Sequence, residues 1–289
     1  MSYQFMLQPK RKATRSGPAL MLAALVAAAT AGYVFTACGD RQSDRAEAGE
    51  PVVSGPVPAP AHASAPVEQP PTVPTPTTAK DFYAIGRSAW KNGDFAKAES
   101  SFTQAITLDS SHVKSRLYLS RVLLETGRGE DALVQIQAAI ALDSTSSEPL
   151  RLEGRAFEAL GRTDDAIGAY KRALVIDDHD VWAMNNLGLL YVKLGRSDDA
   201  LGPIGRAIEL EKNVATFHYN LGVAFEKTGR YTAALDAYRA ALAVEGTFGP
   251  ATTSIARVEE LKEDPTVQPV DLAVVVQKFV EEIGTWKQQ

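Results

Sequence analysis

The sequence predicts an all-α fold, a solenoid of five stacked helix–turn–helix units followed by C-terminal capping helices. One glycine column and two alanine columns that repeat every 34 residues predict this fold. The glycine column is Gly93, Gly127, Gly161, Gly195 and Gly229. The alanine columns are Ala98, Ala132, Ala166, Ala200 and Ala234, and Ala105, Ala139, Ala173, Ala207 and Ala241. Self-similarity at a fixed period indicates a repeat architecture. It sets the units at 79–112, 113–146, 147–180, 181–214 and 215–248.

Apolar residues four positions apart predict two amphipathic helices in each unit. Leu187 and Tyr191 are one such pair in a first helix. The repeated glycine ends each first helix as a left-handed C-cap. In the third and fourth units, Thr163 and Ser197 are the predicted N-caps of the second helix. A small residue also recurs inside the first helix and predicts close helix packing: Gly86, Ser120, Gly154, Gly188 and Gly222.

Two positions depart from the repeat pattern. Glu153 stands in a column that is apolar in the other units, and we expect it to rotate to the surface while Leu152 turns inward. The alternative is that Glu153 pairs with Arg151 or Arg155. The Gly-Pro pair at 202–203 lies inside a second helix. Proline there costs about 3 kcal/mol and typically kinks the helix, so we expect a bend.

Residues 249–289 predict two further helices. The first, over 250–263, carries an apolar face that suits a cap on the fifth unit: Ala251, Ile255, Val258 and Leu261. The second, over 270–286, carries Leu272, Val276, Phe279, Ile283 and Trp286 on one face. We expect this second helix to pack on the end of the solenoid. The alternative is that it folds back into the groove lined by the first helices.

The period and its columns resemble the tetratricopeptide repeat, a helix–turn–helix unit of 34 residues. The resemblance implies a right-handed superhelix whose first helices line a concave groove for peptides or partner helices. The sequence departs from the family pattern in two ways. It lacks the tryptophan often found early in the first helix and the proline that usually closes a unit.

Residues 1–37 predict a signal peptide or membrane anchor. Basic residues within 1–15 precede an uncharged run over 16–39, which is the secretory pattern. The basic flank should stay cytoplasmic, so the chain after residue 40 is expected outside the cytoplasm. Residues 34–38 resemble a bacterial lipobox, although Phe35 replaces the usual aliphatic residue. The resemblance implies lipidation of Cys38, which would become the mature N-terminus.

Two alternatives to a lipoprotein remain open at the N-terminus. The segment could stay uncleaved as a signal anchor, because about 20 apolar residues span a bilayer. The chain could also be cytosolic, with Cys38 as an incidental core thiol.

The segment after the N-terminal signal, residues 38–78, is predicted to form a disordered linker. Nine prolines between positions 51 and 76 prevent helix formation and predict an extended, semi-rigid spacer.

Composition argues against several other functions. A net charge of -5 and a pI near 5.5 disfavour nucleic-acid binding. The single cysteine excludes an intramolecular disulfide and a cysteine-based zinc site, and the four histidines lack metal-ligand spacing. The segments outside the repeats are too short for a catalytic domain, and no nucleophile-elbow, P-loop or zincin motif occurs. We therefore predict no enzyme activity, no cofactor and no metal.

The predicted binding site is the groove. Arginines recur at a spacing of 34 as a ladder, with one more arginine beside it: Arg87, Arg121, Arg155 and Arg151. The later units place neutral and apolar residues there: Asn185, Leu189, Tyr219 and Val223. Guanidinium groups suit carboxylates, so we expect an acidic segment or a free C-terminus as ligand. The alternative is a solvated helix face with the local pairs Arg121–Glu125 and Arg155–Glu158.

These observations predict an exported, membrane-tethered protein–protein interaction scaffold that faces the periplasm of a bacterial cell envelope. Resemblance to bacterial lipoproteins of this build implies a role in assembling pili, secretion machines or cell-wall enzymes. One alternative is a self-assembling structural envelope protein without a peptide ligand. The other is an accessory subunit of an envelope complex, held by an uncleaved signal anchor.

Overall fold

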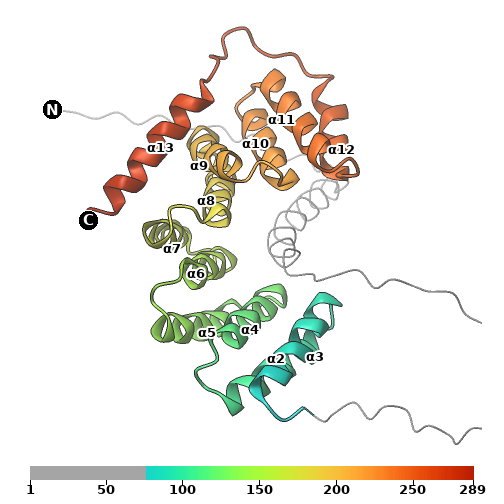
Figure 1. The fold of residues 1–289 in the computed structure, drawn as a ribbon. Helices are drawn as coiled ribbons and strands as arrows, with labels where there is room; N and C mark the ends of the chain where they lie inside the picture. Colours follow the sequence, from blue (N-terminus) through green and yellow to red (C-terminus); the bar gives the residue numbers. More distant parts are fainter. Residues whose placement is uncertain (1–75) are drawn as a thin grey trace, which may run out of the picture. The chain divides into compact units, whose positions relative to one another are not determined.

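The computed structural model describes residues 76–289, and every regular element in that part of the chain is a helix (Figure 1). The first helices of the units are α2 (Ala79–Lys91), α4 (Val113–Glu125), α6 (Ser147–Ala159), α8 (Val181–Lys193) and α10 (Ala215–Lys227). The second helices are α3 (Phe95–Leu108), α5 (Gly129–Leu142), α7 (Thr163–Ile176), α9 (Ser197–Leu210) and α11 (Tyr231–Val244). Two C-terminal helices follow, α12 (Gly249–Val258) and α13 (Leu272–Trp286). The predicted all-α repeat fold is confirmed.

The predictions for residues 1–75 lie outside the described residues. They comprise the signal or anchor, lipidation of Cys38 and nearly all of the proline-rich linker. Within residues 76–289, no helix combines the length and the apolar composition needed to cross a membrane.

A glycine in the left-handed region ends every first helix, as predicted. The φ angles of Gly93, Gly127, Gly161, Gly195 and Gly229 lie between 72° and 77°. In the first unit, the Gly93 N–H donates to the Trp90 carbonyl at 3.0 Å and the Asp94 N–H donates to Ala89 at 2.9 Å. These bonds satisfy carbonyls at the helix C-terminus. The same turn in each unit therefore brings the second helix back against the first.

The small residues of the first helices lie where an aromatic or branched side chain from the second helix crosses. A Cβ added at Gly154 would lie 2.5 Å from Tyr170 Cε1, and one at Gly222 would lie 2.5 Å from Tyr238 Cε1. Both tyrosines are fully buried. The column is thus a packing feature, as the sequence indicates.

The predicted N-caps of the second helices are wrong by one position. The cap residues are Arg162 in α7 and Arg196 in α9, and neither caps through its side chain. Thr163 and Ser197 are the first residues of the helices. Each cap arginine instead pairs at 2.8 Å with an aspartate three residues later, as Arg162 does with Asp165.

Glu153 does not rotate to the surface. It is buried together with Leu152, and its carboxylate pairs with Arg172 of α7 at 2.5 Å. This partner lies on the facing second helix, whereas the sequence suggests the α6 neighbours Arg151 and Arg155. The acid in an apolar column is therefore satisfied inside the unit.

The two C-terminal helices pack on different parts of the solenoid. α12 packs on α11 and α10 and covers the fifth unit as expected, although it ends at Val258. α13 packs mainly on α9 and also contacts α7 (Figure 1). Both expectations for this helix are wrong, because it docks neither on the end of the solenoid nor on the first helices. Its buried residues are Val276, Phe279 and Ile283.

Two glycines in α9 explain where α13 docks. A Cβ added at Gly202 would lie 2.9 Å from Phe279 Cβ, and one at Gly205 would lie 2.6 Å from Val276 Cγ2. Real Cβ atoms essentially never approach that closely. α9 continues through Pro203 between the two glycines. The Gly-Pro pair, for which the sequence suggests only a bend, thus belongs to the docking surface of α13.

Candidate functional site

Consecutive first helices contact one another along the chain of units, from α2 to α4, α6, α8 and α10. All residues of the predicted groove lie on these helices. Arg87 is on α2, Arg121 on α4, Arg151 and Arg155 on α6, Asn185 and Leu189 on α8, and Tyr219 and Val223 on α10. We call the surface formed by these side chains the first-helix face.

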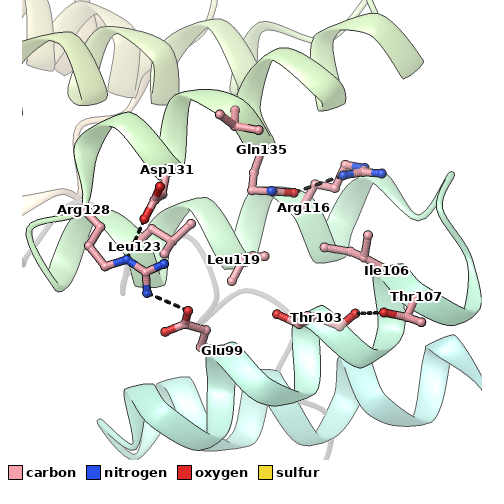
Figure 2. A pocket seen from close by; sticks show the side chains of 11 residues that line it. Glu99, Thr103, Ile106, Thr107, Arg116, Leu119, Leu123, Arg128, Asp131 and Gln135 are labelled. Atoms are coloured by element: carbon pink, nitrogen blue, oxygen red, sulfur yellow. Dashed lines mark hydrogen bonds and ion pairs between the residues drawn. The ribbon is translucent and has the colours of Figure 1, made fainter.

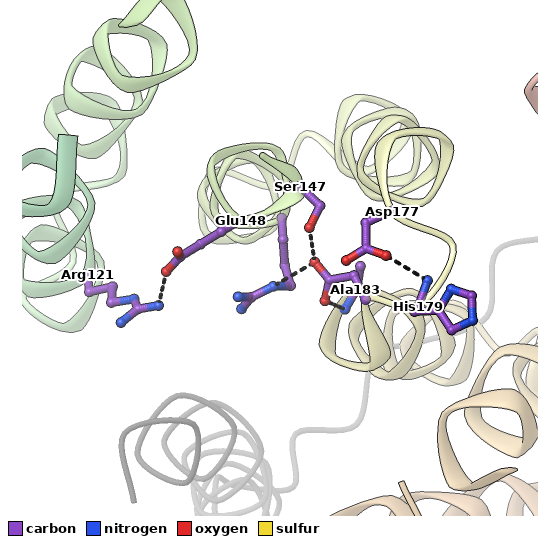
Figure 3. A network of polar contacts seen from close by, with 8 residues as sticks. Arg121, Ser147, Glu148, Asp177, His179 and Ala183 are labelled. Atoms are coloured by element: carbon purple, nitrogen blue, oxygen red, sulfur yellow. Dashed lines mark hydrogen bonds and ion pairs between the residues drawn. The ribbon is translucent and has the colours of Figure 1, made fainter. Parts of the chain in front are cut away.

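Arg121 and Arg155 are paired across units. Arg121 is only 4% exposed, and its Nη2 forms an ion pair with Glu148 of α6 (Figure 3). Arg155 reaches Glu125 of α4 at 3.5 Å, and burial lowers the pKa of its guanidinium from the usual value. Both arginines thus form ion pairs across units, and Glu158 of the same helix also acts electrostatically on Arg155.

Arg121 retains donor capacity. Its guanidinium carbon lies 4.8 Å from the centre of the Tyr118 ring, a cation–π distance. Its Nε is buried and has no hydrogen-bond partner within residues 76–289. A guanidinium has five N–H donors, so Arg121 can hold Glu148 and still bind a second acceptor.

Arg151 belongs to a buried network that joins the third and fourth units. Its Nε lies 3.3 Å from Asp180, and Ser147 donates to the same carboxylate at 2.8 Å. Asp180 is also the N-cap of α8 and accepts the Ala183 N–H at 2.9 Å (Figure 3). The sequence gives little sign of this role, because Asp180 looks like an ordinary inter-unit loop residue.

Arg87 lies against aromatic rings. Its guanidinium carbon is 5.8 Å from the Tyr83 ring centre and 5.7 Å from that of Tyr118. Tyr118 thus contacts both Arg87 and Arg121, one unit apart. The structure brings the predicted arginine ladder together, but as a set of side chains held by aromatic and acidic neighbours.

The other half of the face is a buried amide pair. Asn220 Nδ2 donates to Asn185 Oδ1 at 2.8 Å, and both residues are 2% exposed or less. Asn220 Oδ1 and Thr216 Oγ1 are buried with no hydrogen-bond partner in the described part of the chain. Each such group costs about 1–3 kcal/mol if nothing binds it. These two oxygens are therefore buried acceptors that the described residues leave unsatisfied.

Thr216 is a site residue that the sequence analysis missed. It lies one helical turn before Asn220, so the four-residue spacing of a helix face could have found it. Leu189 and Val223 are buried beside the amide pair, and Tyr219 packs its ring 5.6 Å from Phe248. This half of the face combines apolar contact area with a few fixed polar groups.

A cleft of about 380 Å³ opens on the other side of the first two units, between α3 and α5 (Figure 2). Leu119 and Leu123 of α4 line it. Arg128 joins its two walls by pairing with Glu99 at 2.7 Å and with Asp131 at 2.8 Å. The remaining charged group of the cleft, Arg116, donates to Gln135 at 3.0 Å.

Asp177, Asp178 and His179 form a group of potential metal ligands in the loop after α7. Two basic side chains of the protein contact the acidic part of this group. His179 Nδ1 lies 2.8 Å from Asp178, and Lys287 pairs with the same aspartate at 2.7 Å. This exposed group fits a surface ion-pair cluster.

The helix pairs and the stacked first helices define a helical-repeat protein. The profile described as "Tetratricopeptide repeat" matches residues 83–149 and 185–250, and a "TPR repeat" profile matches 154–195. The chain belongs to the tetratricopeptide repeat family.

Solved structures show the same fold. A thermophilic tetratricopeptide repeat protein of Thermus thermophilus, TTC0263, is 20% identical with a TM-score of 0.58, covering 64% of this chain and 100% of its own. PilF of Pseudomonas aeruginosa is 16% identical with a TM-score of 0.53, covering 71% and 97%. The APC/C hetero-tetramer Cut9–Hcn1 gives 19% identity and a TM-score of 0.59, and the match covers 73% of this chain and 42% of the other chain. A comparison with curated proteins gave no match.

Proposed function

We propose that this chain is an exported, membrane-tethered protein–protein interaction scaffold of the bacterial cell envelope. Its first-helix face binds a peptide segment or a partner protein. Tetratricopeptide repeat proteins generally mediate protein–protein interactions, and the family is typically non-catalytic. The N-terminal basic and apolar pattern of the sequence supports export and tethering.

The observation that carries the proposed binding site is the pair of buried oxygens on α10. Asn220 Oδ1 and Thr216 Oγ1 are acceptors with no partner within residues 76–289. A peptide main chain supplies N–H donors at regular intervals, and a peptide that displaces the side chains covering these oxygens would satisfy both. Leu189 and Val223, which are buried in the unbound chain, would then offer apolar contact to its side chains.

The arginine half of the face supports an acidic partner segment. Arg121 Nε is a buried donor with no protein partner among the described residues, and the guanidinium lies against Tyr118. Because Nε is buried, a ligand carboxylate reaches this donor only when the side chains that cover it move aside. The ion pair of Nη2 with Glu148 can stay in place, so the acid then binds beside it rather than replacing it.

Thr216→Val separates binding from stability. The substitution keeps the side-chain shape and removes an oxygen that the fold does not use, so we expect an equal or higher melting temperature. Recovery of proteins crosslinked to the chain in its native membranes should fall several-fold. The matched control is Thr253→Val on α12, where the hydroxyl only back-bonds to Gly249. Equal recovery with the two variants would argue against a ligand at Thr216.

Cys38→Ser tests the tether. For a lipoprotein, the unchanged chain loses residues 1–37 and gains acyl chains on Cys38, whereas the variant keeps its full N-terminus. Intact mass and fractionation of membranes measure both properties. A wild-type chain that fractionates with membranes, retains residue 1 and carries no acyl group would instead indicate the uncleaved anchor.

A further inference from the structure

The C-terminal helix occupies a site on α9 that no other second helix reproduces. The α9 seat consists of Gly202, Pro203 and Gly205, and the apolar stripe of α13 lies against it. The positions equivalent to the two glycines are Ser100 and Thr103 in α3, Val134 and Gln137 in α5, Gly168 and Lys171 in α7, and Asp236 and Arg239 in α11. Among these second helices, only α9 has glycine at both positions, so only its backbone lets another helix approach closely at this point.

The seat also carries a cost that α9 would bear without α13. Glycine in a helix interior is a poorer helix former than alanine, and an interior proline removes a helix hydrogen bond and clashes with the preceding turn. Docking of α13 offsets the low helix propensity of this part of α9 because it buries Val276, Phe279 and Ile283. The composition of α9 is therefore specific for a helix with the apolar pattern of α13.

Contacts at the C-terminal end of α13 fix the direction of the docked helix. Its N-terminus is capped within the helix, where Asp271 accepts the Ala273 N–H at 3.0 Å. At the other end, Lys287 pairs with Asp178 at 2.7 Å, and Lys171 of α7 lies 4.7 Å from the Trp286 ring centre. The site thus recognises an amphipathic helix that ends in an aromatic residue followed by a basic one.

The segment that joins α12 to α13 permits exchange. Residues 259–271 are mostly exposed. Three of these residues bond to α11 or to its N-cap. Glu259 pairs with Arg239 at 3.0 Å, Glu263 accepts from the Thr232 hydroxyl at 2.8 Å, and the Gln268 carbonyl accepts from Arg230 at 3.0 Å. A linker of this kind can open without unfolding the helices on either side.

We propose that the α9 seat is an exchangeable helix-docking site, and that α13 of a second copy of this chain is its ligand in trans. A swapped pair retains every contact of the closed chain, because the same helix fills the same seat. A short linker gives the chain's own helix an effective concentration of about 1 mM, so dilute chains stay closed. Exchange becomes favourable where copies are crowded, as on a membrane surface. That last step alone rests on the proposed tether.

Two complementary full-length variants test exchange. Phe279→Asp places a charge on the buried stripe, so the chain keeps an empty seat but no competent helix. The double variant Gly202→Leu with Gly205→Leu blocks the seat and frees an intact α13, and leucine is a good helix former in α9. Gly205→Leu alone is a second seat-blocked chain. Hydrogen exchange of each variant should show unprotected α13 amides and unchanged protection of α2 to α12.

The readout is co-purification in detergent of two differently tagged chains expressed together. We expect the Phe279→Asp and seat-blocked chains to recover each other at least tenfold above either variant paired with itself. Replacing Phe279→Asp by Val274→Asp, at a position 64% exposed on the same helix, should return recovery to background. If α13 is released in both chains but the complementary pair co-purifies no better than background, the proposal that α13 exchanges between chains is wrong. Protected α13 amides in both seat-blocked chains would overturn the seat itself. Neither outcome depends on whether the chain is tethered or binds a peptide.

Discussion

Asp180→Ala is expected to lower the free energy of unfolding by about 3–5 kcal/mol, because it removes one partner of a buried ion pair. The side chains of Arg151 and Asp180 are 8% and 7% exposed. Asp180 also accepts from Ser147 and caps α8. Its removal therefore weakens the junction between the third and fourth units in three ways at once. Urea denaturation followed by circular dichroism measures the loss.

Two further variants divide this effect into its parts. Asp180→Asn keeps a capping oxygen and loses only the charge, so we expect it to retain about 1 kcal/mol of the stability that alanine loses. Asp165→Ala removes an aspartate whose pair with Arg162 is half exposed, and it should cost less than about 1 kcal/mol. A loss for Asp180→Ala no larger than that of Asp165→Ala would show that the buried network is energetically unimportant.

The same substitution should have opposite effects at two glycines. At Gly188, an added Cβ would lie 2.4 Å from Ile204 Cγ1 and 3.2 Å from the Ala200 carbonyl oxygen. Ile204 is fully buried. Gly188→Ala should therefore force α8 and α9 apart and cost about 1–3 kcal/mol.

Gly168→Ala is the matched control. Gly168 lies inside α7, and nothing comes within 4 Å of an added Cβ. Alanine there should stabilise the helix by about 0.5–1 kcal/mol. The two variants are compared by denaturant midpoint under the same conditions. Equal stability of both would contradict close packing as the reason for the small-residue column.

The repeat geometry could be predicted from the sequence because the same local rules apply in every unit. A glycine with φ near 75° can be inferred from its place after each first helix, and a small residue inside each first helix indicates a crossing. These features depend on neighbours at fixed spacing within one unit. Periodicity alone therefore defines the helix pairs and the residues of the first-helix face.

Apart from the N-caps of α7 and α9, which are displaced by one residue, the failed predictions concern contacts between elements. Glu153 finds Arg172 on the facing helix, and Arg121 finds Glu148 in the next unit. Both partners lie too far along the chain for a spacing rule within one helix. The site of α13 depends on Gly202 and Gly205 in a single unit, so no repeated column points to it. The local signal there, proline in a helix, indicates only a bend.

The most direct test of the scaffold function compares two photo-reactive residues in the full-length chain in its own membranes. One replaces Tyr219 on the first-helix face. The other replaces Val134, which is 61% exposed on α5 and lines the cleft between α3 and α5. Irradiation should give partner adducts from position 219 and few or none from position 134. Adducts from position 134 alone, or equal yields from both positions, would contradict binding at the first-helix face.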